Sequence, residues 1–194
     1  MAGGGCQFFL YFCTEVVSTF FKVKNIRKSI SVKKEGTTSL GKAHEFSYAY
    51  NFFDMIEFET KNVEMPALDF AKVEEWLGEV AAAHERRIGN LNYLFCDDEE
   101  ILRVNREFLH HDYYTDIITF DYSHRDRVGG DLFISLDTVR SNADGLGVEY
   151  ESELLRVIVH GLLHLCGIDD KGPGEREIME SHEDAALKLW ASVK

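Results

Sequence analysis

Two histidines four residues apart lie inside an apolar stretch of this sequence. His160 and His164 fall within Leu154–Cys166, which is apolar on almost every side when it is read as a helix. A spacing of four residues places both imidazoles on one face of that helix, one turn apart. Gly167 follows, and glycine commonly takes the left-handed conformation that ends a helix. If the chain reverses there, Asp170 returns toward the two histidines.

These three side chains suit a divalent transition metal. Two neutral imidazoles and the Asp170 carboxylate form a ligand set typical of catalytic zinc, with a fourth position left for water. Manganese and nickel are the alternative ions. The competing interpretation is a pair of hydrogen-bonded core histidines. Burying two imidazoles in an apolar helix costs a few kcal/mol unless each finds a partner, and one metal ion satisfies both. We therefore predict a zinc site.

The composition describes a globular protein with one main domain. The chain has 194 residues, 45% of them hydrophobic and 28% charged, which is long enough to bury a core. A formal charge of −13 argues against indiscriminate binding of DNA or of anionic membranes, but it allows a local basic groove. The candidates for such a groove are Arg86/Arg87, Arg103/Arg106 and Arg125/Arg127. Four cysteines without a CxxC pair favour reduced thiols and a cytoplasmic location.

The elements that must position the histidines alternate between strands and helices from Met55 onward. The patterns predict a strand opening at Met55 and further strands over 91–96, 117–122 and 130–135. They predict helices over 69–86, 97–109, 136–143, from Tyr150 onward, and over 177–193, with a break at Gly89–Asn90. The predicted architecture is α+β: roughly a four-stranded mixed sheet packed with about five helices, the metal-binding helix being central.

Residues 1–54 differ from the rest of the chain. They carry 7 basic and 4 acidic residues, which leaves 14 basic and 30 acidic residues for 55–194. The apolar run at 7–21 is interrupted by Glu15 and is too short to span a bilayer. We predict a working domain over 55–194, preceded by an N-terminal extension at 1–54. That extension is interpreted as disordered or as a mis-assigned start.

The stretch HGLLHLCGIDD, residues 160–170, has the metal-ligand spacing of the metzincin proteases, with their last histidine replaced by aspartate. Those proteases need a glutamate directly after the first histidine, where it acts as the general base. In this sequence Gly161 occupies that position and cannot carry a proton. The ligand spacing is therefore kept while the peptidase base is missing.

The same stretch resembles more closely the signature of the YbeY family, H-G-x-L-H-L-x-G-[aromatic]-D-H. Two upstream segments also resemble that family: FLHHDYYTDIITF at 108–120 matches its T-[ND]-V-L-S-F segment, and GGDLFISLDTV at 129–139 matches its G-D-I strand and following helix. The resemblance covers about 55–194. It implies a single-strand-specific, metal-dependent endoribonuclease that matures the 3′ end of small-subunit ribosomal RNA. It also implies roles in ribosome biogenesis and quality control in the cytoplasm. The implied partners are ribosomal RNA, ribosomal proteins and assembly GTPases, but neither DNA nor membranes.

Two positions depart from the family pattern. Asp170 stands where the family has its third metal histidine. A carboxylate there makes the site more anionic, which raises the pKa of bound water and favours harder metals such as manganese or magnesium. Leu109 stands where the family commonly has an arginine. Charge stabilisation of a phosphate must then come from His110, His111 or an arginine such as Arg106.

The remaining site residues follow as hypotheses. His111 is the candidate general acid or base, with His110 as the alternative. Asp169 orients a ligand imidazole by accepting its free N–H, and Asp116 is a second candidate for that role. The candidate substrate-binding residues are Arg106, His110 and Tyr113, the last by stacking on an unpaired base. For each residue taken singly, the competing interpretation is an ordinary surface or core side chain.

Two other functions fit the same residues. One is a metal hydrolase with a substrate other than RNA. The other is a non-catalytic ribosome-assembly factor in which the metal is structural. An open fourth coordination position separates the catalytic interpretations from the structural one.

Overall fold

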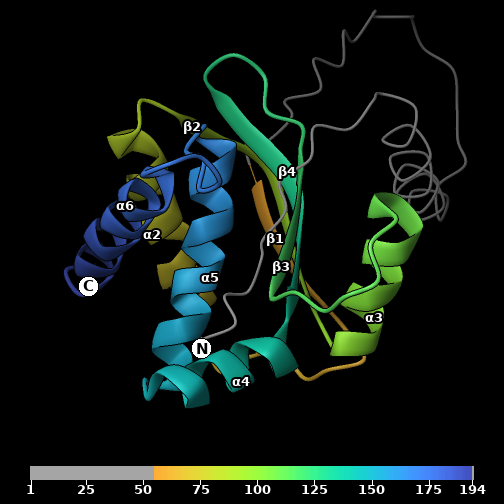
Figure 1. The fold of residues 1–194 in the computed structure, drawn as a ribbon. Helices are drawn as coiled ribbons and strands as arrows, with labels where there is room; N and C mark the ends of the chain where they lie inside the picture. Colours follow the sequence, from red (N-terminus) through yellow and green to blue (C-terminus); the bar gives the residue numbers. More distant parts are fainter. Residues whose placement is uncertain (1–54, 194) are drawn as a thin grey trace, which may run out of the picture. The chain divides into compact units, whose positions relative to one another are not determined.

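The computed structural model describes residues 55–193 (Figure 1). This part of the chain forms four strands: β1 (Met55–Lys61), β2 (Arg87–Cys96), β3 (Ile117–Asp121) and β4 (Arg127–Ser135). Its five α-helices are α2 (Phe70–Ala83), α3 (Asp98–Val104), α4 (Leu136–Leu146), α5 (Tyr150–Leu165) and α6 (Glu175–Trp190). A short π-helical segment, η1 (Asn105–Leu109), continues α3. The predicted α+β class, with four strands and five helices, is confirmed.

The strands form one mixed sheet in the order β1-β2-β4-β3. Strands β1, β2 and β4 are parallel, and β3 pairs with β4 in the antiparallel direction through a tight hairpin. Parallel neighbours need a crossover connection, which α2 supplies between β1 and β2. The predicted hairpin-like arrangement of the last two strands is therefore confirmed.

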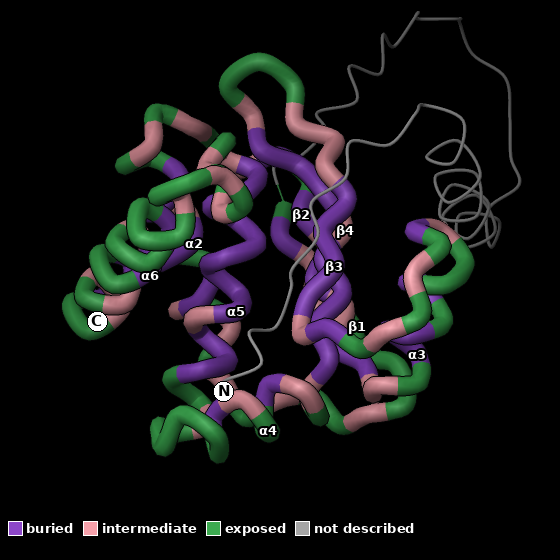
Figure 2. Tube along the Cα trace, in the orientation of Figure 1, coloured by how far each residue is buried: buried purple, intermediate pink, exposed green. Residues whose placement is uncertain are grey.

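Helices cover both faces of the sheet, and α5 lies between the sheet and the outer helix α6 (Figure 1). Helices α2, α5 and α6 pack on one face, with core residues such as Trp76, Leu132 and Ile158. Helix α3 and η1 cover the other face, where Ile101 and Phe133 belong to a second cluster. Adjacent residues of β4 point to opposite faces, as the two-residue period of a strand requires. In Figure 2 the buried part of the trace follows α5 and the strands.

Several element boundaries differ from the predictions. Helix α2 ends at Ala83, three residues early, because Glu85 takes a left-handed conformation with φ of 57°. Strand β2 then starts at Arg87, so the predicted break at Gly89–Asn90 was wrong. The register of β2 against β4 shifts between Ile88 and Leu91, which places this Gly–Asn pair in a bulge. A Cβ at Gly89 would lie 2.8 Å from the carbonyl oxygen of Val128, so glycine is needed there.

The predictions for residues 1–54, and the apolar run within them, lie outside the described residues. Within residues 55–193, no helix combines the length and the apolar character needed to cross a bilayer. Cys96 and Cys166 both carry free thiols, as predicted.

Candidate metal centre

Helix α5 is buried along nearly its whole length. From Leu154 to Leu165 every residue is buried except Arg156, which is half-buried. Such a helix cannot leave a polar side chain without a partner, because the desolvation cost of an unpaired imidazole would fall on the folded state. His160 and His164 each keep only 5% of their surface exposed, so their ring nitrogens must be satisfied inside the protein.

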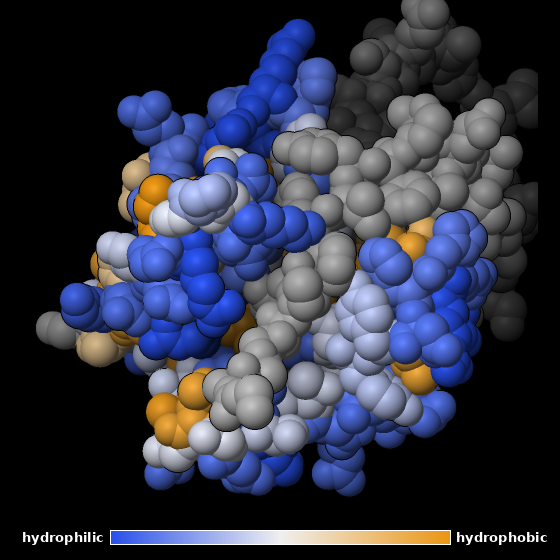
Figure 3. Space-filling model, in the orientation of Figure 1, coloured by the Kyte–Doolittle hydropathy of each residue, from blue (hydrophilic) through white to orange (hydrophobic). Residues whose placement is uncertain are grey.

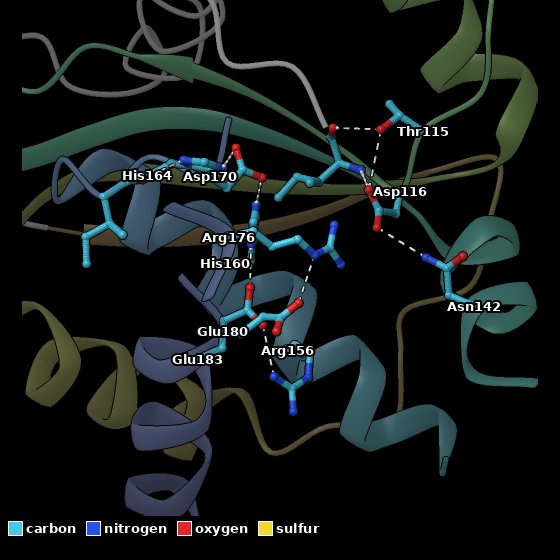
Figure 4. A network of polar contacts seen from close by, with 12 residues as sticks. Thr115, Asp116, Asn142, Arg156, His160, His164, Asp170, Arg176, Glu180 and Glu183 are labelled. Atoms are coloured by element: carbon cyan, nitrogen blue, oxygen red, sulfur yellow. Dashed lines mark hydrogen bonds and ion pairs between the residues drawn. The ribbon is translucent and has the colours of Figure 1, made fainter. Parts of the chain in front are cut away.

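The Nδ1 atoms of both imidazole rings have hydrogen-bond partners. His164 Nδ1 lies 2.8 Å from the carbonyl oxygen of Ile168. A carbonyl only accepts, so Nδ1 carries the proton and donates it. His160 Nδ1 donates in the same way to Glu183 Oε1 at 2.6 Å. Because Nδ1 carries the proton in these bonds, each ring keeps a lone pair on Nε2. Both Nε2 atoms lie on the side of Asp170 (Figure 4).

Asp170 reaches the histidines because the chain reverses directly after α5. Gly167 has φ of 97°, and the amide of Ile168 donates to the carbonyl of Leu163 at 3.1 Å. The amide of Gly167 donates to His164 O at 2.9 Å, which completes a Schellman motif. The predicted reversal at Gly167 is therefore confirmed, and the same turn brings the Ile168 carbonyl back to His164.

The three side chains leave room for one cation. The Nε2 atoms of His160 and His164 each lie 3.9 Å from a carboxylate oxygen of Asp170, too far for a hydrogen bond. Two metal–ligand bonds of about 2.0–2.2 Å span at most about 4.0–4.4 Å end to end, so both separations are within the reach of two ligands of one zinc-sized ion. His160 Nε2 and Asp170 Oδ1 are buried and make no hydrogen bond within the described part of the chain. Polar atoms that are buried and unpaired in this way fit a metal.

Electrostatics favour the neutral, metal-binding form of the site. Burial, together with the smaller effect of the neighbouring His160, lowers the pKa of His164 to about 3. The imidazole of His164 is therefore neutral at pH 7, with its Nε2 lone pair available. Within residues 55–193, these three side chains form the one group of histidine, cysteine or acidic residues whose donor atoms converge closely enough to hold an ion.

Sequence reasoning missed Glu183, which contacts the site from α6. Its carboxylate is buried, with 8% of the side chain exposed, and it lies between His160 and Arg156. The Arg156 guanidinium donates to Glu183 Oε2 at 2.9 Å, which balances the buried charge. One signal was available in the sequence: Glu183 shares a helix face with Met179 and Ala186, the other buried residues of α6. A glutamate on the apolar face of a helix needs a buried partner.

Asp116 and Asp169 were predicted to accept the free N–H groups of the ligand imidazoles. For the Nδ1–H groups of His160 and His164 that prediction was wrong. Glu183 and the Ile168 carbonyl take the two Nδ1–H groups instead. Asp116 accepts hydrogen bonds from the amide of Ile117 and from the side chain of Asn142 on α4 (Figure 4). Asp169 is exposed, one residue before the ligand Asp170.

Gly161 explains physically why the peptidase base is missing. A Cβ at this position would lie 2.3 Å from Leu132 Cδ2 and 2.7 Å from Ile117 Cδ1. The residue after His160 therefore faces β3 and β4 so closely that any side chain there would have to displace the buried ends of Leu132 and Ile117. The metzincin-like ligand spacing is present, but the position of the proteolytic glutamate is closed by the sheet.

We expect Gly161→Glu to destabilise the protein without creating peptidase activity. Overpacking of a core costs typically about 1–3 kcal/mol, and a buried unpaired carboxylate adds to that cost. Thermal denaturation of Gly161→Glu beside the exposed-glycine control Gly145→Glu measures the difference, because a Cβ at Gly145 meets nothing within 4 Å. Equal melting temperatures of the two variants would contradict the packing argument.

A second substitution tests the turn after α5. Gly167→Ala should cost about 1–2 kcal/mol, since an alanine is strained in the left-handed conformation. Because the turn also sets the position of Asp170, the metal affinity should fall together with the melting temperature. Gly145→Ala, in the last turn of α4, is the control. Unchanged metal affinity in Gly167→Ala would show that Asp170 is placed independently of the turn.

The other predicted residues lie on η1 and the loop that follows it. The rings of His111 and Tyr113 stack with centroids 5.3 Å apart, and the Tyr113 hydroxyl lies 3.2 Å from His111 Nδ1. His110 is exposed and takes a left-handed conformation with φ of 56° at the end of η1. Arg106 is exposed and its Nε donates to Asp112 at 2.6 Å. The structure thus brings His111 and Tyr113 together, while Arg106 has a carboxylate partner.

Two features of this region bear on phosphate binding. The surface hollow beside Arg106 is lined by more carboxylates than cations: Asn62, Glu99, Glu100, Arg103, Arg106 and Glu107. Leu109, which stands where the YbeY pattern has arginine, is buried in the core cluster of the α3 face. In this chain the residue at that position, Leu109, therefore packs in the core, as expected for an apolar side chain.

Comparison with known proteins gives the family. A sequence model of endoribonuclease YbeY matches residues 55–191. The chain belongs to the YbeY endoribonuclease family. It is 58% identical over 134 residues to endoribonuclease YbeY of Bacteroides thetaiotaomicron, covering 69% of this chain and 98% of that protein. It is 59% identical over 135 residues to endoribonuclease YbeY of Phocaeicola vulgatus, covering 70% and 98%. The solution structure of TM1509 from Thermotoga maritima is similar with a TM-score of 0.50 and 27% identity, covering 71% of this chain and 93% of that one. The resemblance to YbeY found from the sequence motifs is confirmed.

Proposed function

We propose that this chain is a metal-dependent endoribonuclease that cuts single-stranded RNA and matures the 3′ end of small-subunit ribosomal RNA in the cytoplasm. The observation that carries the proposal is the convergence of His160, His164 and Asp170 in a YbeY-family chain. An endoribonuclease hydrolyses phosphodiester bonds within RNA, and the relatives at 58% and 59% identity bear that name. Ribosomal proteins and assembly GTPases are the further partners of this proposal.

The three ligands define what the chain's own residues do. A divalent ion held by them would polarise a phosphate oxygen and lower the pKa of a water at the open fourth position. His160 and His164 present their Nε2 atoms to the site, because each Nδ1 is occupied by a hydrogen bond, and Asp170 supplies an oxygen donor. We propose zinc as the ion, with manganese or nickel as alternatives. The carboxylate favours harder ions more than a third histidine would.

Catalytic and substrate-binding roles extend this proposal to the loop after η1. His111, hydrogen-bonded to the Tyr113 hydroxyl, is the proposed general acid or base, and Tyr113 is the proposed stacking surface for a base. Asp169 is proposed to act in catalysis from its exposed place beside Asp170. His110 and Arg106 are proposed to contact the RNA backbone.

The test is RNA cleavage by the purified full chain, with single-stranded and duplex substrates of equal length. Cleavage of the single strand that is lost with a chelator and restored by zinc or manganese supports the proposal. Two outcomes contradict it. One is cleavage that resists chelation, which indicates a contaminating nuclease. The other is stoichiometric metal without cleavage of either substrate, which indicates a structural metal.

We also propose that the working domain is 55–194 and that residues 1–54 form an extension or a mis-assigned start. The intact mass of the native protein distinguishes an N-terminal extension from a mis-assigned start. A species that begins at Met1 contradicts the mis-assigned start.

A further inference from the structure

Two arginine pairs that are far apart in the sequence come together at one end of the molecule. Arg86 directly precedes β2 and Arg87 is its first residue, while Arg125 and Arg127 belong to the β3–β4 hairpin. Arg87 and Arg127 are partners across the β2–β4 register. The Arg86 guanidinium donates to the main-chain carbonyl of Arg125. The third pair, Arg103 and Arg106 on α3 and η1, forms ion pairs with Glu100 and Asp112.

This basic edge adjoins the end of the metal-binding helix. Arg86 Nη2 lies 3.5 Å from the carbonyl oxygen of Cys166 and 3.9 Å from where a Cβ of Gly167 would be. Those residues lie two and three positions after His164, and exposed Lys171 follows Asp170. In Figure 1 the β3–β4 hairpin and the end of α5 lie at the same end of the domain. Figure 3 shows hydrophilic side chains covering that end.

The charge at this edge differs in sign from the rest of the domain. Three short segments, 85–87, 125–127 and 169–171, make up this edge. They carry five cations, Arg86, Arg87, Arg125, Arg127 and Lys171, and, besides Asp170, three acids, Glu85, Asp126 and Asp169. Asp126 is held by Arg87, with 2.7 Å between its Oδ2 and the arginine Nε. Residues 55–194 as a whole, by contrast, have 30 acidic and 14 basic side chains, this edge included. An excess of cations beside the ligands of an otherwise acidic domain indicates a place for an anion.

Arg125 has a left-handed backbone conformation, which glycine adopts more readily than arginine. It is exposed at the hairpin tip with φ of 55°, in the left-handed region that glycine adopts at lower conformational cost. Its carbonyl serves Arg86, but any residue would provide that carbonyl. Strain of this kind points to a role for the side chain itself.

We propose that this basic edge, formed by Arg86, Arg125, Arg127 and Lys171, binds the phosphates of single-stranded RNA that extends away from the metal centre. The inference rests on the proposed function and adds the path of the substrate. Arginine suits this task because its planar guanidinium donates to phosphate oxygens in a two-pronged geometry. Contacts to phosphates fix the strand's position without reading its sequence.

The test is Arg125→Gly in the full chain, because glycine keeps the carbonyl that Arg86 needs and relieves the strain. We expect its melting temperature to equal or exceed that of the wild type. Binding of a fluorescent single-stranded oligoribonucleotide is measured in chelator, which prevents cleavage, between about 50 and 300 mM salt. Loss of one phosphate contact should reduce the slope of log affinity against log salt by about 0.7, or about fivefold in affinity at roughly 0.1 M.

Two matched variants serve as comparisons. Lys188→Gln removes one charge from an exposed position of α6, and we expect it to keep the wild-type slope. Arg106→Gln tests the rival phosphate contact beside η1. If Arg125→Gly keeps the wild-type slope while the wild type binds and cleaves RNA, the basic edge is not the substrate path and the proposed function stands. If the wild type neither binds nor cleaves RNA, the proposed function itself fails.

Discussion

Replacing His160 with alanine should remove both the bound metal and the cleavage of RNA. The variant loses one of three donors whose atoms all lie within 4.8 Å of one another. Removing an outer partner of a metal ligand costs about 10–100-fold in affinity, and losing the ligand itself should exceed the upper end of that range. Because cleavage is proposed to depend on the ion, its rate should fall to the level of chelated wild type. Elemental analysis and single-turnover cleavage measure the two quantities.

Asp170→Ala provides the matched comparison in the same experiment. We expect it to lose the metal as His160→Ala does, since the two Nε2 atoms alone leave an incomplete ligand set. Full metal occupancy in Asp170→Ala would place the third ligand elsewhere, with Asp169 as the next candidate. Full occupancy in His160→Ala would contradict the metal centre itself.

The second large effect is expected from Glu183→Ala, although Glu183 contacts the candidate ligand His160 and is not itself one of the three candidate ligands. Its removal leaves the Nδ1–H of His160 buried without its acceptor and leaves Arg156 without its buried carboxylate. We expect the metal affinity to fall by about 10–100-fold, because such a carboxylate fixes the ring's proton and orientation. An unmet buried donor also costs about 1–3 kcal/mol of stability. Competition with a chromophoric chelator measures the affinity.

Two further variants separate orientation from general destabilisation. Glu183→Gln keeps an oxygen that can accept a hydrogen bond from His160 Nδ1–H, so it should retain part of the metal affinity that Glu183→Ala loses. Asp184→Asn breaks only the partly exposed ion pair to Arg156, 2.9 Å long, and should leave metal affinity unchanged. Equal metal affinities in Glu183→Ala and the wild type would show that Glu183 serves packing alone. Nitrogen NMR of the His160 ring gives a readout that is independent of activity.

Sequence patterns predicted the architecture because its periodicities are strong. The run from Leu154 to Cys166 is apolar on almost every face of a helix, which predicts burial on all sides, and this part of α5 is buried. Asp69 and Asp97 were expected at helix starts, and each accepts an amide hydrogen bond there. The start of β2 was missed because Gly89 usually signals a break, whereas here it permits close contact with Val128. That use of glycine depends on a partner strand nearly forty residues away.

The metal centre was predictable to the extent that it is local in sequence. His160, His164, Gly167 and Asp170 lie within one helix and its turn, so spacing alone places them. Glu183 comes from another helix, and its contact with His160 depends on how α6 packs against α5. The basic edge depends likewise on the β2–β4 register, which no local pattern contains. Contacts between elements set the surroundings of the site.

The closeness of Gly161 to the sheet also limits how this site can change over evolution. A glutamate at position 161 would displace the buried ends of Ile117 and Leu132 unless smaller side chains were already present there. Each of those replacements alone would open a cavity in the core and lower stability before any new activity appeared. No single step therefore leads from this ligand arrangement to peptide hydrolysis without an unstable intermediate. The two chemistries share a ligand spacing but are separated by a barrier of several coordinated substitutions.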